Sequence, residues 1–209
     1  MSLDVINRLT VMTSSVITYT CHMGRWEPNA NERLREAALE LYVEKGFEQT
    51  TIVEIAERAG LTARTFFRHF PDKREVLFAG STELRDHMVK AVADAPASTS
   101  PMDAVAAALD AAAAVLGGRH PHSRRRQSVI VANAELRERE LMKMESLADA
   151  LADALRDRGV PDADAQLAAR AGITVFRVAF DRWVSDRRDR NLSKVMRTAL
   201  DQLRAITAS

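Results

Sequence analysis

A segment of twenty residues in the first third of the chain carries the side chains with the clearest chemistry. Thr51 and Glu54 have the spacing of a capping box, in which a hydroxyl and a carboxylate satisfy free N–H groups at the start of a helix. Thr62 is placed to cap a second short helix in the same way. Arg64 and Arg68 lie one turn apart on that helix, and guanidinium groups suit hydrogen bonds to phosphates and base edges. The pattern predicts two capped helices that present cations to a nucleic acid.

Apolar residues of the same segment indicate how the cations are positioned. Phe66 and Phe70 lie one turn apart and form the inward face of the second helix, whereas Phe67 falls on the outer face with the arginines. Gly60 marks the turn between the two helices, so the arrangement is that of a helix-turn-helix. Two phenylalanines at this spacing also fit plain core packing, and Phe66 and Phe70 are core residues in either interpretation.

Positive charge is concentrated on this segment. From Thr62 to Arg74 four basic residues accompany one acidic residue, a local charge of +3. The whole chain of 209 residues has 30 Lys+Arg against 29 Asp+Glu, which excludes a protein that coats nucleic acid with a polybasic surface. This distribution predicts contact with DNA at a few positions rather than broad, indiscriminate binding.

The elements that must hold this segment are predicted to be helices throughout. The chain has only 8 Gly and 6 Pro, 46% of its residues are hydrophobic, and apolar residues recur with helical spacing. We expect an all-α fold of about nine helices without a strand, in which the helix beginning at Asp72 joins two domains as a lever. The expected helices cover residues 31–46, 51–59, 62–70, 72–95, 102–116, 135–158, 162–186 and 191–207, and one more ends near Ala132. Arg119–Arg126 before it is either a basic loop or the start of that helix.

Other features narrow the functional classes. The single cysteine, Cys21, excludes a disulfide or a cysteine-based zinc site within one chain. His120 and His122 are too few for a metal site and are expected on the surface, so we expect no metal and no cofactor. Arg124–Arg126 is expected to be solvated, or else to meet an acidic ligand or the DNA backbone. No catalytic motif and no apolar run of about 20 residues is present, so we expect neither an enzyme nor a membrane protein, and a cytoplasmic location.

Four stretches of the N-terminal part follow one another with a characteristic order and spacing. They are Gly46-Phe47, Thr50-Thr51-Ile52-x-x-Ile55-Ala56-x-x-Ala59-Gly60-Leu61-Thr62, Thr65-Phe66-Phe67-Arg68-His69-Phe70-Pro71-Asp72-Lys73 and Val76-Leu77. With these motifs, residues 31–78 resemble the DNA-binding domain of the TetR family of transcriptional regulators. The resemblance implies an N-terminal three-helix helix-turn-helix domain at 31–78 and a helical domain for effector binding and dimerisation at 79–209. Residues 1–30 would form an N-terminal extension that is disordered or loosely docked.

The resemblance also implies which residues contact DNA. Thr51 and Thr62 would lie near phosphates, Arg64 would face base edges, and Lys73 would meet the DNA backbone. The family usually carries a tyrosine at the position of Phe67, which has no hydroxyl to donate to a phosphate. The expected DNA-binding set is Thr51, Thr62, Ala63, Arg64, Thr65, Phe67, Arg68, His69 and Lys73, of which His69 fits packing at the end of its helix better than direct contact.

The C-terminal part of the chain is poor in aromatic residues, with none between Phe78 and Phe176. A cavity there would have mostly aliphatic walls and would suit a small, largely apolar effector, whereas a filled core is the alternative. Methionine side chains adapt to varied ligands and are natural lining residues. The expected effector pocket comprises Met88, Met142, Met144, Phe176 and Phe180.

Residues 163–184 are apolar around nearly the whole helix, and the last helix carries a second apolar stripe. Such helices need cover on two sides, which indicates a four-helix interface between two copies of the chain; a buried helix in a monomer is the alternative. The expected interface residues are Leu167, Ala171, Val175, Val178, Leu192, Val195, Met196, Ala199 and Leu203.

These features combine into one functional prediction. We expect a homodimeric, sequence-specific transcriptional regulator, a repressor that binds a palindromic operator in double-stranded DNA and is released by a small-molecule effector. One alternative is an activator or architectural DNA-binding protein without an effector. A helical enzyme or adaptor is a third, for which the sequence shows no convergent polar site.

Overall fold

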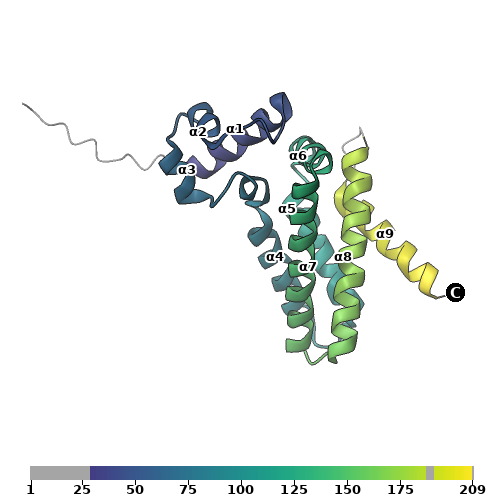
Figure 1. The fold of residues 1–209 in the computed structure, drawn as a ribbon. Coiled ribbons are helices and arrows are strands. Elements are labelled where there is room, and N and C mark those ends of the chain that lie inside the picture. Colours follow the sequence, from purple (N-terminus) through teal and green to yellow (C-terminus); the bar gives the residue numbers. More distant parts are fainter. Residues whose placement is uncertain (1–28, 187–190, 209) are drawn as a thin grey trace, which may run out of the picture.

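The chain folds into helices connected by short loops (Figure 1). The computed structural model describes residues 29–186 and 191–208, and these residues contain nine α-helices, a short 3₁₀ helix (η1) and no strand. The all-α prediction is confirmed, whereas the extension expected at residues 1–30 lies outside the described residues except for its last two positions. The elements are α1 (Ala30–Lys45), α2 (Ile52–Arg58), α3 (Ala63–His69), η1 (Glu75–Phe78), α4 (Ser81–Ala93), α5 (Pro101–Leu116), α6 (His120–Ala132), α7 (Ala134–Asp157), α8 (Asp162–Ser185) and α9 (Leu192–Thr207).

Aromatic rings pack the interior of the N-terminal helices. Tyr42, Phe47, Phe66 and Phe70 are all at least 96% buried, and Tyr42 meets Phe47 edge-on with 5.2 Å between ring centres. The same apolar cluster continues into the C-terminal part of the chain, where Val129 and Ile130 of α6 and Leu136 of α7 join it. Helix α1 therefore packs directly against α6, and the core of the N-terminal helices continues into α7.

The prediction of one long helix from Asp72 to about Ala95 is wrong. This segment forms two separate helices, η1 and α4. Val76, Leu77 and Phe78 are consecutive and all buried. Three consecutive residues of an α-helix point in directions about 100° apart, so one apolar surface cannot cover all of them. Here the segment lies between the two parts of the molecule and is covered from several sides, and α4 restarts after Gly80.

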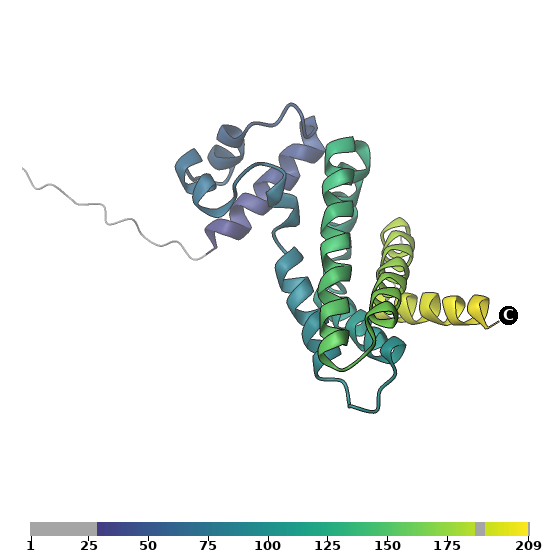
Figure 2. The same cartoon turned by 60° about the horizontal axis from the view of Figure 1, so that its bottom comes forward.

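The C-terminal helices form a bundle from which α9 projects sideways (Figures 1 and 2). Helices α5 and α8 approach closely at Gly172, where an added Cβ would lie 2.3 Å from Cγ1 of Val105. No single helix of the described residues is long and apolar enough to cross a membrane; α5 and α6 meet that test only as a pair bent by 100°.

His120 is a core residue, contrary to the expected surface position. It is 95% buried at the start of α6, where Nε2 lies 3.0 Å from the carbonyl oxygen of Trp183. The two rings meet edge-on, with 4.7 Å between their centres. This contact anchors the start of α6 to the end of α8.

Candidate nucleic-acid interface and cavity

Helix α3 presents one apolar and one polar face, as its sequence predicts. The Thr62 side chain caps the helix by accepting a hydrogen bond from the backbone N–H of Thr65 over 3.2 Å. Phe66 is fully buried and holds the helix on the core. Phe67 is 57% exposed on the other side, next to the exposed Arg64 and Arg68.

The capping box at the start of α2 is present and is reinforced by a lysine. The N–H of Thr51 donates to Oε2 of Glu54 over 2.8 Å, and the N–H of Glu54 donates back to Oγ1 of Thr51 over 3.3 Å. Lys45 at the end of α1 also forms an ion pair with Glu54. Hydrogen bonds from Lys45 and Thr51 lower the pKa of Glu54 to about 2, so this carboxylate is ionised at neutral pH and holds α2 against α1.

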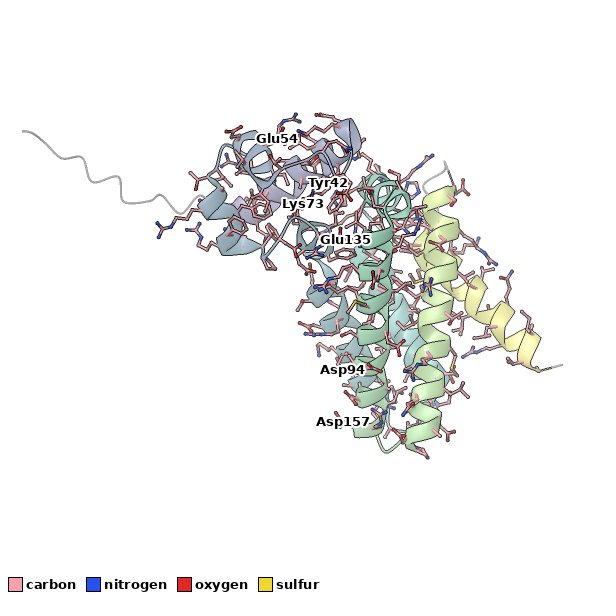
Figure 3. The ribbon with its side chains drawn as sticks, viewed as in Figure 1. Tyr42, Glu54, Lys73, Asp94, Glu135 and Asp157 are labelled. Atoms are coloured by element: carbon pink, nitrogen blue, oxygen red, sulfur yellow. The ribbon has the colours of Figure 1, made fainter. Side chains whose placement is uncertain are left out.

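Lys73 is placed differently from the expected contact with the DNA backbone. Its ammonium group donates to the carbonyl oxygens of Phe47, Glu48 and Thr50 at 2.9, 3.3 and 3.1 Å. A lysine has three N–H donors, so all of them are used inside the protein. The Tyr42 hydroxyl donates to the Lys73 carbonyl over 2.6 Å, and the two residues lie close together in Figure 3. Lys73 thus holds the turn that leads into α2 and positions Thr51 indirectly.

Two cations of α3 remain available to a ligand. Within residues 29–186 and 191–208, neither Arg64 nor Arg68 forms an ion pair or a side-chain hydrogen bond. Arg58 of α2, by contrast, is paired with Glu40 and Glu44 of α1. An exposed helix with unpaired guanidinium groups fits contact with phosphates and bases.

The remaining residues of the expected DNA-binding set lie around this helix. Thr51 and Thr62 are exposed, and Ala63 and Thr65 are half-buried at the start of α3. His69 is half-buried beside Phe70, with 6.3 Å between the ring centres, and its Nε2 is buried. The position of His69 favours packing over contact with DNA.

A cavity of about 540 Å³ lies where α1 meets the C-terminal helices. Apolar side chains form one part of its wall, among them Leu84, Leu116, Met144, Phe176 and Phe180. Charged side chains, which the expected and mostly aliphatic lining did not include, form the rest of the wall: six arginine and lysine residues together with His122, and three acidic residues. The basic residues are Arg35, Arg119, Arg126, Arg137, Lys143 and Arg177, and the acidic ones are Glu83, Glu140 and Asp181.

Arg126 connects this cavity to the segment that follows the helix-turn-helix. Its Nε donates to the carbonyl oxygen of Leu77 in η1 over 2.7 Å, and its Nη1 donates to Glu140 over 3.2 Å. The guanidinium lies 5.1 Å from the centre of the Phe78 ring. Arg126, from the run of arginines expected to be solvated, therefore faces inward, where burial lowers its pKa.

Ion pairs hold η1 on α7 beside the cavity. Glu75 accepts hydrogen bonds from Nε of Arg139 over 2.6 Å and from Nζ of Lys143 over 3.1 Å. Arg74 forms an ion pair with Glu135 at the start of α7 (Figure 3). The segment between α3 and α4 is thus tied to α7 by three ion pairs.

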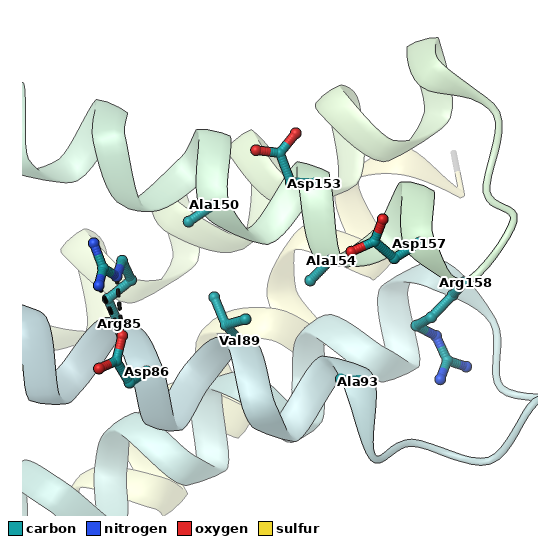
Figure 4. Close-up of a pocket in the computed structure, with 9 residues that line it drawn as sticks. All are labelled: Arg85, Asp86, Val89, Ala93, Ala150, Asp153, Ala154, Asp157 and Arg158. Atoms are coloured by element: carbon teal, nitrogen blue, oxygen red, sulfur yellow. Dashed lines mark hydrogen bonds and ion pairs between the residues drawn. The ribbon is translucent and has the colours of Figure 1, made fainter.

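A second hollow, of about 520 Å³, lies between α4 and α7 (Figure 4). Its wall consists of small apolar residues and charged ones whose arginines are already engaged. Arg85 donates to Asp86, and Arg158 donates to the carbonyl oxygens of Ala95 and Pro96. This hollow offers a ligand fewer available polar groups than the larger cavity does.

Comparison with known families identifies both parts of the chain. Residues 34–79 match the family described as bacterial regulatory proteins, tetR family. Residues 99–208, more than half of the chain, match a TetR C-terminal family described as the MftR C-terminal domain. The chain belongs to the TetR family. It is therefore a DNA-binding transcriptional regulator with a helix-turn-helix domain and a helical C-terminal domain, in a family of regulators rather than enzymes.

Three similar proteins show how far the likeness of this TetR-family chain extends. It is 36% identical over 80 residues to the HTH-type transcriptional regulator TcmR of Streptomyces glaucescens, a match that covers 38% of this chain and 35% of that one. The solved FadR of Bacillus subtilis, in complex with stearoyl-CoA, shares the fold with a TM-score of 0.59 at 19% identity, over 82% of this chain and 96% of that one. FadR of Thermus thermophilus, a TetR-family repressor in complex with lauroyl-CoA, is 26% identical with a TM-score of 0.51, over 83% and 92% of the two chains.

The five residues expected to form an effector pocket in this TetR-family chain do not all meet. Met144, Phe176 and Phe180 line the larger cavity, and the two phenylalanine rings stack with 5.8 Å between their centres. Met88 is fully buried in the core of the bundle and Met142 is 57% exposed, so neither lines the cavity.

The expected interface residues on α8 and α9 also divide into two groups. Leu167 and Val178 are 72% and 41% exposed, and Ala171, Val195 and Leu203 are partly exposed. The other four are buried in the core of their own chain: Val175, Leu192, Met196 and Ala199. Helix α8 is not apolar all round, because Arg170, Arg177 and Arg182 are exposed on it.

The candidate ligand-binding residues that sequence reasoning missed are the cations of the cavity. Arg35, Arg119 and Arg126 come from α1, from the residue before α6 and from α6 itself, so no sequence motif brings them together. A partial signal was present at residues 123–130, where Ser123, Arg126, Gln127 and Ile130 share one face of a helix with helical spacing.

Proposed function

We propose that this TetR-family regulator is a repressor that binds a palindromic operator as a homodimer. The observation that supports this is the exposed, unpaired pair Arg64 and Arg68 on the capped helix α3. A two-fold dimer carries two such helices, which suit half-sites about 34 Å apart or a multiple of the helical repeat. In this proposal residues 31–78 bind DNA, residues 79–209 are regulatory, and the protein acts in the cytoplasm.

The proposed dimer forms through α8 and α9. Large apolar side chains stand exposed on both helices, with Leu167 at 72%, Val178 at 41% and Ile206 at 74%. An exposed apolar surface of this kind needs cover, and a second copy of the same two helices provides it with two-fold symmetry. Sedimentation of the full chain should give a dimer, and Val178→Asp should shift it toward a monomer.

The proposed effector is a small molecule with both apolar and polar parts, rather than the largely apolar one expected from the sequence. The cavity has room for such a ligand and borders η1, the segment that follows the DNA-binding helices. Two solved relatives carry amphipathic ligands, stearoyl-CoA and lauroyl-CoA. Binding that favours a conformation with altered spacing of the two α3 helices would release the operator.

A mobility-shift experiment tests the proposal. The full chain is titrated into duplexes from the DNA upstream of its own gene, with and without palindromic symmetry, at moderate salt. We expect a shift that requires the palindrome and that lauroyl-CoA reverses. Equal binding to a scrambled duplex would overturn operator recognition, and a palindrome-dependent shift that no amphiphile changes would favour an effector-independent regulator.

A further inference from the structure

Basic side chains from both domains converge at one end of the larger cavity. Arg35 comes from α1 of the DNA-binding domain, whereas Arg119, His122 and Arg126 come from the start of α6 and the residue before it. The Arg35 guanidinium reaches the start of α4, where its Nη2 lies 3.8 Å from the place of a Cβ on Gly80. The four side chains thus span the boundary between the domains.

The charge of this cluster is only partly compensated. Within the described residues Arg35 and Arg119 form no ion pair and no side-chain hydrogen bond. His122 lies 3.8 Å from Glu36, a carboxylate that also accepts a hydrogen bond from Arg125. Glu32 and Glu83 also attract Arg35, but from beyond ion-pair distance, and Glu140 attracts Arg126.

Burial and neighbouring positive charges both disfavour the charged forms of these groups. Burial and the charge of Arg119 lower the pKa of Arg35. Burial also lowers the pKa of His122, with Arg35 among the cations that add to the effect. Bringing like charges together in a partly buried space costs free energy, and an anion placed among them would recover it.

Other groups on the same wall fit a ligand with an anionic head. The first turns of α4 and α6 border the cavity through Gly80, Ser81 and Ser123, and neither helix has a side-chain cap on its free N–H groups. Nε2 of Gln127 donates to Oε2 of Glu140 over 3.3 Å, and its buried Oε1 has no donor among the described residues, so this oxygen suits a hydroxyl or N–H group of a ligand rather than the anion itself. Apolar residues such as Leu116 and Phe180 continue the wall away from the cations.

We propose that Arg35, Arg119, His122 and Arg126 form a site for the phosphate or carboxylate head of an amphipathic ligand. The inference rests on the proposed effector cavity and specifies its chemistry. Because Arg35 belongs to the DNA-binding domain, the anion contacts that domain directly and draws α1 toward α6. The charged head, rather than the apolar tail, then carries the signal from the cavity to α1.

Ligands that share one tail and differ only in the head test the proposal. Binding of decyl phosphate, decanol and decyltrimethylammonium to the full chain is measured by titration calorimetry below their micelle concentrations, with inorganic phosphate as the head alone. We expect decyl phosphate to bind at least about tenfold more tightly than decanol, since each charge-assisted hydrogen bond strengthens binding, and decyltrimethylammonium to bind most weakly. Equal binding of decyl phosphate and decanol would overturn the anion site. Inorganic phosphate that binds as tightly as decyl phosphate would overturn the amphipathic ligand in favour of a free anion.

Charge-removing variants locate the site. Arg35→Gln and Arg119→Gln should each lower the affinity for decyl phosphate by about tenfold and leave the affinity for decanol unchanged. Arg35→Lys keeps the charge and should retain part of the affinity for decyl phosphate. Arg85→Gln is the matched control, because Arg85 lies on α4 beside Asp86 and outside this cavity. Circular dichroism checks that each variant is folded, and an unchanged phosphate preference in folded Arg35→Gln and Arg119→Gln would overturn the proposal.

DNA binding by the ligand-free protein is measured in the same samples. If the wild-type chain binds its operator but shows no preference for the phosphate head, the anion site fails and the regulator proposal stands. If the wild-type chain binds no operator, the proposed repressor fails independently of the ligand result.

Discussion

The ammonium nitrogen of Lys73 lies 2.9 Å from the carbonyl oxygen of Phe47 and 4.4 Å from the centre of the Phe47 ring. This lysine follows α3 and the phenylalanine follows α1, so the contact closes the DNA-binding domain behind the turn into α2. The lysine therefore supports the DNA-binding surface from inside the domain. It stabilises the backbone that leads to Thr51 at the start of α2.

Replacing Lys73 with methionine should lower stability and leave the salt dependence of DNA binding unchanged. The variant loses three hydrogen bonds to carbonyl oxygens, and we expect a loss of about 1–3 kcal/mol in the free energy of unfolding. Chemical denaturation measures this, and binding to one duplex over a range of salt concentrations gives the slope. A slope reduced by about 1 would instead assign Lys73 to a phosphate contact.

Removing the Arg64 side chain should reduce selectivity more than general affinity for DNA. A guanidinium that forms two hydrogen bonds to a guanine contributes about 1–3 kcal/mol of discrimination, whereas random duplexes lose only a charge. Fluorescence anisotropy on operator and random duplexes measures Arg64→Ala beside Arg58→Ala, whose arginine is engaged with Glu40 and Glu44. Equal losses of Arg64→Ala on both duplexes would reject a base-reading role.

Changing Phe67 to tyrosine should strengthen binding to every duplex by a similar amount. Phe67 is 57% exposed on α3, so a hydroxyl can be added without displacing the core. A new hydrogen bond to a phosphate contributes about 0.5–1.5 kcal/mol and carries no sequence information. Stability should change by no more than about 0.5 kcal/mol. A gain confined to the operator would show that position 67 faces a base rather than the backbone.

An alanine at Gly172 should destabilise the bundle, because its Cβ would overlap Val105. Overpacking of this kind costs about 1–3 kcal/mol. Val105→Ala in the same chain should remove much of that cost, which a double-mutant cycle followed by urea unfolding would detect. Additive losses in the double variant would place the strain somewhere other than this contact.

Helix ends proved predictable where the signal is local. The spacing of Thr51 and Glu54 predicts one cap and the place of Thr62 before its helix predicts the other, and both caps are present. The fold class and the buried role of Phe66 and Phe70 likewise follow from spacing within a single helix.

The features that the sequence did not predict depend on contacts between segments that are distant in the chain. The helix breaks after Phe78 because η1 is covered from several sides. His120 is buried against Trp183, which lies 63 positions away in the chain, so no local pattern shows this contact. Arg126 turns inward for the same reason, since its partner Leu77 belongs to η1. Spacing within α6 alone cannot distinguish a solvated arginine from one that binds a carbonyl oxygen in another element.

The apolar cluster that Val129, Ile130 and Leu136 share with the DNA-binding domain has a practical consequence for dissecting the protein. A fragment cut after residue 78 would lose these three side chains and leave its own aromatic core open to water. The smallest fragment with a complete core therefore extends into α7. The DNA-binding domain and helices α6 and α7 contribute to this one core, so heat or denaturant should unfold them together in a single cooperative transition. The DNA-binding domain should then show no separate unfolding transition of its own.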